Sequence, residues 1–303
     1  MATESEKHGV FISHSSTNLE DAKQFEAALT AAGFDPWLDK SDIRVGALLG
    51  KELKQAIEGS RAVVLIWSVA SQQSPWVTTE ILTAFHLDRF ILPYALDATE
   101  LPQILSKSIY GDLRKDRASA LEKLGRDVSR APQSRNEFPG SVVYQTVELQ
   151  EQINQLADRQ MAITDCLGRD DLAGAEKLQR DLDPSMSAAE SQWKFDPTIL
   201  NLSGYHKKNA YMIAHWAEYC AGRYPKDPLL DEGRSRFFET LLINPIEYSA
   251  LNGLGNILLF QGELNAAEFF VSCAIRCSQK AGVDYWQAKN DLKIIQSRLN
   301  ASA

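Results

Sequence analysis

One apolar stretch, "AVVLIWS" at residues 62–68, limits the possible folds of this chain more than any other feature. Its first six residues are all apolar, so a strand formed by them cannot have one face in water. A strand that is covered on both faces is typical of the centre of a parallel sheet with helices on either side. The flanking sequence therefore has to supply further strands, separated by helices.

The flanking sequence has this alternation of strands and helices. Four further strand signals occur, at residues 9–15, 34–39, 90–96 and, more weakly, 108–113. Helical patterns fill the gaps between them, at residues 22–32, 49–58, 76–87 and 117–128. Pro36 places the second strand at a sheet edge, because proline cannot donate to a central ladder. The pattern predicts a doubly wound α/β sheet, in which ligands lie in the loops at the carboxyl ends of the strands.

Beyond residue 130 the strand signals end. The segment "RAPQSRNEFPG" has two prolines and few apolar residues, so it is interpreted as containing a linker. We predict a first domain at residues 1–133, a linker at 134–141 and an all-α domain at 142–303. In the last of these, residues 251–275 resemble a helix pair of the tetratricopeptide repeat (TPR), with Gly262 at the turn. A TPR-like helical-repeat domain is therefore expected.

Composition excludes several classes of protein. The net charge of −8 argues against broad nucleic-acid binding, which depends on Lys and Arg contacts to phosphates. No apolar run reaches the roughly 18 residues that cross a membrane, and the polar start "MATESEKHG" lacks a secretion signal. A cytoplasmic location without membrane or direct nucleic-acid contact is expected. The four cysteines are interpreted as buried thiols rather than metal ligands.

The stretch "SPWVTTEIL" after the central strand begins like a helix. Ser74 is a good N-cap, and Pro75 suits the first helical position. Trp76 and Glu80 are then one turn apart on the same face. On an arbitrary helix such a pair is most often a packing residue beside a solvated charge, so the pair alone does not identify a site.

Several motifs in order resemble a TIR domain, the Toll/interleukin-1-receptor type of flavodoxin-like fold. "VFISHSS" resembles the first strand, "GFDPWLDKSDIRVG" the second strand and BB loop, and "SRAVVLIWS" the third strand. "SPWVTTEI" resembles the helix that carries the catalytic glutamate in TIR domains that cleave NAD+. The resemblance covers about residues 8–130. It implies cleavage of the bond between nicotinamide and ribose, with Glu80 as the catalytic residue.

The chemistry of this reaction is compatible with one carboxylate. Nicotinamide leaves as a neutral molecule from a cationic pyridinium, so the general acid of an ordinary glycosidase is not needed. A preorganised carboxylate has only to stabilise the positive charge that develops on the ribose. Trp76 could provide an aromatic wall for a pyridinium or adenine ring. NAD+ is thus expected as a substrate, and no cofactor or metal is expected.

Further substrate-binding candidates lie in the loops at the strand ends. Ser13, His14 and Ser15 end the first strand, whereas Asp39 and Ile43 belong to the segment that resembles the BB loop. For His14, ligand contact and plain loop packing stay equally open. For Asp39, the alternative is a role in capping and turn formation.

Three functions compete at this stage. The first is an NAD+ glycohydrolase or cyclase that is activated by self-assembly, or by a protein or small-molecule trigger at the helical domain, in antiphage defence or cell-suicide signalling. In the family, a neighbour's BB loop often completes the site. The second is a non-catalytic TIR adaptor or effector that acts through protein–protein contacts. The third is an enzyme that makes a cyclic nucleotide messenger. The sequence does not distinguish hydrolysis from cyclisation.

Overall fold

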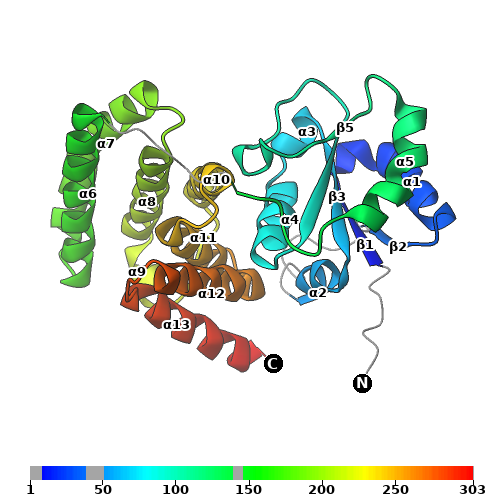
Figure 1. Cartoon of the computed structure of the whole chain (residues 1–303). Coiled ribbons are helices and arrows are strands. Elements are labelled where there is room, and N and C mark those ends of the chain that lie inside the picture. The colour runs from blue at the N-terminus through cyan, green and yellow to red at the C-terminus, as the bar shows by residue number, and fades with distance from the viewer. Residues whose placement is uncertain (1–8, 39–50, 139–145, 303) are drawn as a thin grey trace. The chain divides into compact units, whose positions relative to one another are not determined.

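The computed structural model describes residues 9–38, 51–138 and 146–302. The chain divides into two compact units, Met1–Pro139 and Gly140–Ala303 (Figure 1). The division falls inside the segment predicted as a linker. Each unit has a hydrophobic core of its own.

The first unit is built on a five-stranded parallel sheet with the order β2-β1-β3-β4-β5. This is the order of flavodoxin-like folds, so the predicted fold class of this unit is confirmed. Strand β2, which contains Pro36, lies at the sheet edge as predicted. The strands are β1 (Gly9–Ser13), β2 (Asp35–Leu38), β3 (Ala62–Trp67), β4 (Phe90–Ala95) and β5 (Gly111–Asp112).

Helices cover both faces of this sheet (Figure 1). Val10 and Ile12 share a core with residues of α1 and α5 on one face. Because side chains alternate along a strand, Phe11 and Ser13 point to the other face, on which α2 and α4 contact β1. The helical segments are η1 (Ser16–Asn18), α1 (Leu19–Ala31), α2 (Lys51–Gly59), α3 (Val69–Gln72), α4 (Pro75–His86), η2 (Gln103–Leu105) and α5 (Arg117–Arg130).

The first part of the predicted linker is packed on this unit. The side-chain amide of Asn136 accepts a hydrogen bond from the Ile91 amide N–H (2.7 Å) and donates one to the Ile91 carbonyl (2.9 Å). It thereby binds the edge of β4 as a neighbouring strand would, where the two-residue β5 does not reach. Arg135 lies over the Phe85 ring, 4.1 Å from its centroid. These contacts are long-range, so the local composition that suggested a linker does not reveal them.

The second unit is all-α in its described residues, as predicted. Residues 251–275, which resemble a TPR helix pair, form α11 and α12, with Gly262 at φ +81° in the turn between them. Gly255 permits their close approach, because a Cβ there would lie 2.3 Å from Val271 Cγ2. The helices are α6 (Val147–Gly168), α7 (Leu172–Gln192), α8 (Pro197–Ala214), α9 (Trp216–Cys220), α10 (Pro228–Ile243), α11 (Tyr248–Phe260), α12 (Leu264–Lys280) and α13 (Trp286–Ser302).

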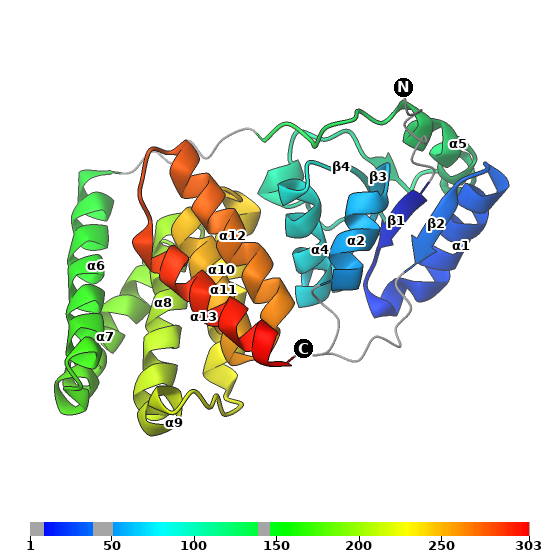
Figure 2. The same cartoon turned by 90° about the horizontal axis from the view of Figure 1, so that it is seen from below.

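Two details of the second unit go beyond the helix pair recognised in the sequence. Helices α8 and α9 are separate, because the backbone leaves helical geometry at His215 (φ −123°, ψ 33°). Helix α13 is a further helix after that pair. It packs against α12 and α11 (Figure 2). The TPR-like character of the unit stays a prediction.

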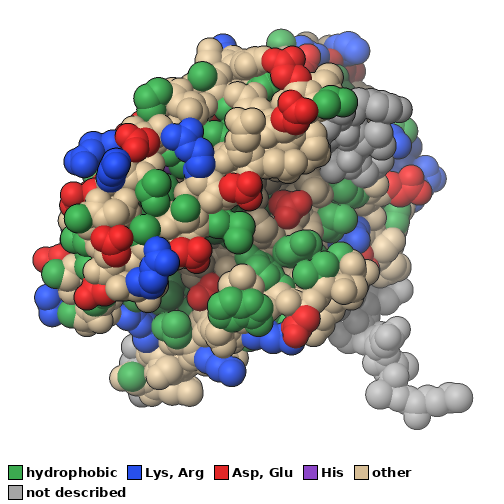
Figure 3. Space-filling model, turned by 90° about the vertical axis from the view of Figure 1, so that its left-hand side faces the viewer, with side chains coloured by type: hydrophobic (Ala, Val, Ile, Leu, Met, Phe, Trp, Pro, Cys, Tyr) green, Lys and Arg blue, Asp and Glu red, His purple; other side chains and the backbone are tan. Residues whose placement is uncertain are grey.

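The described helices include none that is both long and apolar enough to cross a membrane. On the face shown in Figure 3, acidic, basic and hydrophobic side chains are interspersed, and no large block of basic residues is visible there.

Candidate functional site

Glu80 lies in the second turn of α4, and the start of that helix forms as its sequence predicts. The Ser74 hydroxyl accepts a hydrogen bond from the Val77 N–H (3.3 Å), and Pro75 occupies the first turn. The Glu80 side chain has no solvent-exposed surface. A solvated charge, which is the common outcome for such a residue on a helix, is therefore excluded in this structure.

The Glu80 carboxylate is held by the end of the first strand. Ser13, also fully buried, donates its hydroxyl to Glu80 Oε2 at 2.5 Å. Ser13 is the last residue of β1, which lies beside β3 in the sheet. The strand order reverses between β1 and β3, and in doubly wound sheets ligands bind at such a point, outside the carboxyl ends of the strands. The structure thus brings together two of the predicted site residues that are 67 positions apart in the chain.

The loops that follow β1 and β3 are fastened to each other beside this pair. The Ser68 hydroxyl donates to Asn18 Oδ1 (2.8 Å), and the Ser71 hydroxyl donates to the Ile66 carbonyl (2.7 Å). Ser15, a predicted substrate-binding residue, is buried, and its hydroxyl accepts a hydrogen bond from the Thr17 N–H (3.4 Å). Its role in this structure is that of an N-cap for η1.

Two polar atoms of predicted site residues are buried without partners in the described part of the chain. They are His14 Nδ1 and Trp76 Nε1. Burial lowers the pKa of His14 below its ordinary value of 6.5, although a hydrogen bond with the Ile12 backbone opposes the shift. The imidazole is therefore neutral at pH 7. A buried polar atom that makes no hydrogen bond costs free energy, which a bound polar molecule could recover.

The other aromatic residues near the sheet have structural partners. Trp67 is 2% exposed and donates its indole N–H to the Glu100 carbonyl (2.9 Å), so it belongs to the core. Trp37 stacks on Phe11, with ring centroids 5.0 Å apart. Trp76 is only half-buried and so keeps surface available for contact with a ligand.

Asp97, in the loop after β4, is a further polar residue of the strand-end loops. Its carboxylate accepts hydrogen bonds from the backbone N–H groups of Val69 and Thr99, both at 2.9 Å. Desolvation raises its pKa, but these hydrogen bonds prevail and lower it. Asp97 thereby joins the loop after β4 to helix α3. Its position directly after the strand predicted at residues 90–96 was the feature of the sequence that could have identified it as a loop residue near the site. The predicted residues Asp39 and Ile43 lie outside the described residues.

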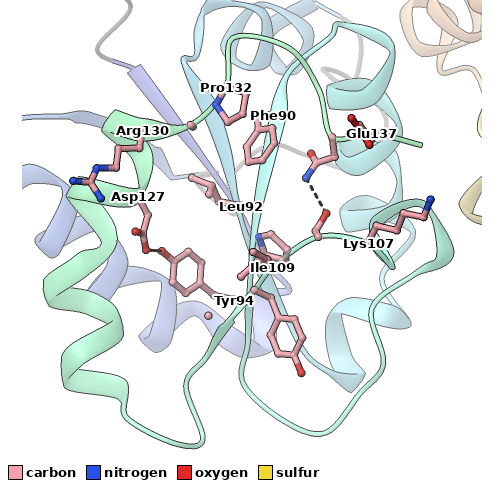
Figure 4. A pocket seen from close by; sticks show the side chains of 15 residues that line it. Phe90, Leu92, Tyr94, Lys107, Ile109, Asp127, Arg130, Pro132 and Glu137 are labelled. Carbon is pink, nitrogen blue, oxygen red and sulfur yellow. Dashed lines mark hydrogen bonds between the residues drawn. The ribbon is translucent and has the colours of Figure 1, made fainter. Parts of the chain in front are cut away.

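The first unit also contains a pocket of about 500 Å³ (Figure 4). Glu80 is not among the residues that line it. The pocket lies between β4, β5, the end of α5 and the segment that follows α5. Tyr94, which lines it, belongs to the core that faces α1 and α5, whereas Glu80 lies on α4 on the opposite face of the sheet. The Tyr94 hydroxyl donates to Asp127 Oδ2 (3.0 Å), and burial and the Asp127 charge raise its pKa.

Comparison with known proteins identifies the first unit. Residues 10–125 match the family described as TIR domain. No curated protein and no solved structure matches the chain significantly. The matched residues span β2 to β5, all of β1 except Gly9, the Ser13–Glu80 pair and most of α5. The chain therefore carries a TIR domain at residues 10–125, followed by a helix-rich region.

Proposed function

We propose that the TIR domain cleaves NAD+ between nicotinamide and ribose, with Glu80 as the catalytic residue. The observation that carries the proposal is the position of this carboxylate. It lies at the strand-order switch point, in a solvent-free environment, and is oriented by the Ser13 hydroxyl. Electrostatic stabilisation is strongest from preorganised groups in surroundings from which water is excluded.

The reaction needs little else from the protein. As the glycosidic bond stretches, positive charge moves from the pyridinium to the ribose ring, and the bonding electron pair leaves with nicotinamide. An ionised Glu80 next to the ribose stabilises this charge. Attack by water then gives ADP-ribose, and attack by a group of the same molecule gives a cyclised product. His14 Nδ1 and Trp76 Nε1, which have no hydrogen-bond partner among the described residues, support contact with polar groups of the same substrate.

The complete burial of Glu80 has a consequence for regulation. Because the side chain has no exposed surface, NAD+ reaches it only after a rearrangement that opens a path to the carboxylate. We propose that self-association of TIR domains, or a trigger bound by the helical region, supplies that rearrangement. An isolated chain is then nearly inactive. Regulated depletion of NAD+ would suit cell-suicide or antiphage signalling.

Nicotinamide release from NAD+ at increasing protein concentration tests the proposal, with products separated by chromatography. We expect turnover per molecule to rise with concentration. Glu80→Gln, which keeps the shape of the side chain, should lower turnover at least about 100-fold, the loss typical of a stabilising group at a developing charge. Glu52→Gln, at an exposed position of α2, is the matched control and should leave turnover unchanged.

A second candidate function is that of a non-catalytic adaptor. It is favoured by exposed apolar residues before β5, where Ile109 is 96% and Tyr110 is 45% exposed. Exposed apolar side chains of this kind are often contact residues for another protein. If Glu80→Gln matches the wild-type protein, the catalytic role of Glu80 is refuted. If no nicotinamide is released at any concentration, activation by self-association is refuted and the adaptor is supported.

A further inference from the structure

Helices α8, α11 and α13 of the helical unit bring a group of polar side chains together. Tyr205 and Lys208 belong to α8, Asn252 and Asn256 belong to α11, and Asp291 belongs to α13. Tyr285 lies just before α13. These six residues are called the Lys208 cluster below, and no part of the proposed NAD+ reaction uses them.

The base of the Lys208 cluster is fixed by hydrogen bonds to α11. The Tyr205 hydroxyl donates to the Ser249 carbonyl (2.7 Å). On the other side, the side-chain amides of Asn252 and Asn256 both donate to Asp291 Oδ2, at 2.9 and 3.1 Å. The three helices are thus joined by polar contacts, and the orientations of these side chains are set before any ligand binds.

Lys208 is a cation without a countercharge in contact. Its side chain is half-buried, and its Nζ lies over the Tyr205 ring, 4.9 Å from the centroid. Among the described residues, no carboxylate oxygen lies within ion-pair distance of this nitrogen. Burial lowers the pKa of Lys208, and the charge of Asp291 acts in the opposite direction. The neighbouring Lys207, by contrast, forms an ion pair with Glu232 at 2.7 Å.

Two acceptor atoms of the Lys208 cluster are also unused. Asn252 is 3% exposed, and its Oδ1 is buried without a hydrogen-bond partner in the described part of the chain. Both amide hydrogen bonds to Asp291 end on Oδ2, so within the same described residues Oδ1 accepts none. An orphaned buried acceptor is costly, whereas a bound N–H donor would satisfy it.

The charges of the Lys208 cluster limit the class of ligand. Burial, together with the nearby Asp291, raises the pKa of both Tyr205 and Tyr285, so the two hydroxyls are neutral. The charges of Lys208 and Asp291 then add to zero. A polyanion such as a nucleotide or pyrophosphate would be repelled by Asp291. A suitable ligand has an anionic group that contacts Lys208 and a nearby N–H donor that contacts Asn252 Oδ1 and Asp291 Oδ1.

We propose that the Lys208 cluster binds a molecule with a carboxylate and an N–H donor on the adjacent carbon. A free α-amino acid and the C-terminal residue of a peptide share this chemistry. The carboxylate would contact Lys208, and the ammonium or amide N–H would contact Asp291 Oδ1 and, once a shift of the neighbouring side chains uncovers it, the buried Asn252 Oδ1. Such a ligand could act at the helical region independently of any reaction in the TIR domain.

Binding measurements on the full chain test this proposal with three sets of probes. The first set is the standard free L-amino acids, the second their N-acetyl derivatives, which imitate peptide C-termini, and the third their C-terminal amides, which lack the carboxylate. We expect at least one member of the first two sets to raise the melting temperature and to bind in calorimetry. Its amide should not bind. Preference for the first or the second set distinguishes the free amino acid from the peptide terminus.

Matched variants assign the binding to the Lys208 cluster. Lys208→Met should weaken binding at least about tenfold, as expected for loss of a charge-assisted hydrogen bond. Lys207→Met keeps the wild-type affinity. Acylation read by mass spectrometry supplies a second readout, because a lowered pKa makes the amine of Lys208 more reactive; the ligand should slow labelling of Lys208 and not of Lys207.

Three results would overturn the proposal: no probe of the first two sets binds, binding is unchanged in Lys208→Met, or pyrophosphate binds at Lys208 more tightly than every carboxylate probe. None of them depends on whether the TIR domain cleaves NAD+.

Discussion

The Ser13–Glu80 hydrogen bond lets us predict how much stability the variant Ser13→Ala loses. The substitution removes the only donor hydroxyl of that side chain and leaves a fully buried carboxylate oxygen, Oε2, without it. Removing one partner from a buried pair costs about 1–3 kcal/mol. We therefore expect the N-terminal unit to lose about 2 kcal/mol of unfolding free energy. If Glu80 is catalytic, its loss of orientation should also lower kcat, by about tenfold for each 1.4 kcal/mol.

A double-mutant cycle separates this bond from the general effect of each substitution. The stabilities of Ser13→Ala, Glu80→Gln and the double variant are compared with the wild-type protein. Residues in direct contact should show a coupling free energy of about 0.5–3 kcal/mol. Because two units unfold in one chain, we suggest a short protease pulse in increasing urea, with the surviving N-terminal fragment measured on a gel. Ser15→Ala is the control, because its hydroxyl accepts only a long hydrogen bond from the Thr17 N–H.

A coupling free energy indistinguishable from zero would refute this reasoning, because it would mean that Ser13 and Glu80 do not stabilise each other. A stability loss in Ser13→Ala no larger than that in Ser15→Ala would have the same meaning. If the coupling free energy lies in the expected range but Ser13→Ala keeps the wild-type turnover, the Ser13 hydroxyl has a structural role and no catalytic one.

Two further perturbations test the TIR unit. Gly111→Ala places a Cβ 2.3 Å from Cδ1 of the Tyr94 ring. We therefore expect overpacking to lower the unfolding free energy by about 1–3 kcal/mol in the same urea assay. The control is Gly59→Ala, which should be nearly neutral because the space around its Cβ is open. The pKa of His14 is lower in the folded protein than in the unfolded chain, so the unfolded chain binds a proton at a higher pH. The stabilisation from neutral His14 is therefore complete above pH 6.5 and is lost as the pH falls from the unfolded pKa to the folded pKa. His14→Asn should flatten this fall in urea midpoints measured from pH 8 to pH 5, and an unchanged slope would show that another group titrates.

The local sequence predicted the five strands and the four longer helices of the TIR domain, but not the short segments α3, η1 and η2. The uniformly apolar β3 required cover on both sides, and Pro36 required an edge position. The cap and proline before Trp76 set the start of α4, and this start fixed the helix position of Glu80. These inferences depend on neighbours in the chain, on side-chain periodicity and on backbone restrictions, all of which can be read from a single sequence.

Contacts between distant segments could not be read in this way. The sequence left open whether Glu80 was solvated or buried, and only the packing of α4 against β1 buried it beside Ser13. Local composition suggested a linker at Asn136, but the side chain of that residue pairs with the edge of β4. The Lys208 cluster likewise exists only because three helices meet. Periodicity tells which face of an element is buried, whereas the partner on that face is chosen by the whole tertiary structure, through packing and hydrogen bonds between residues far apart in the chain.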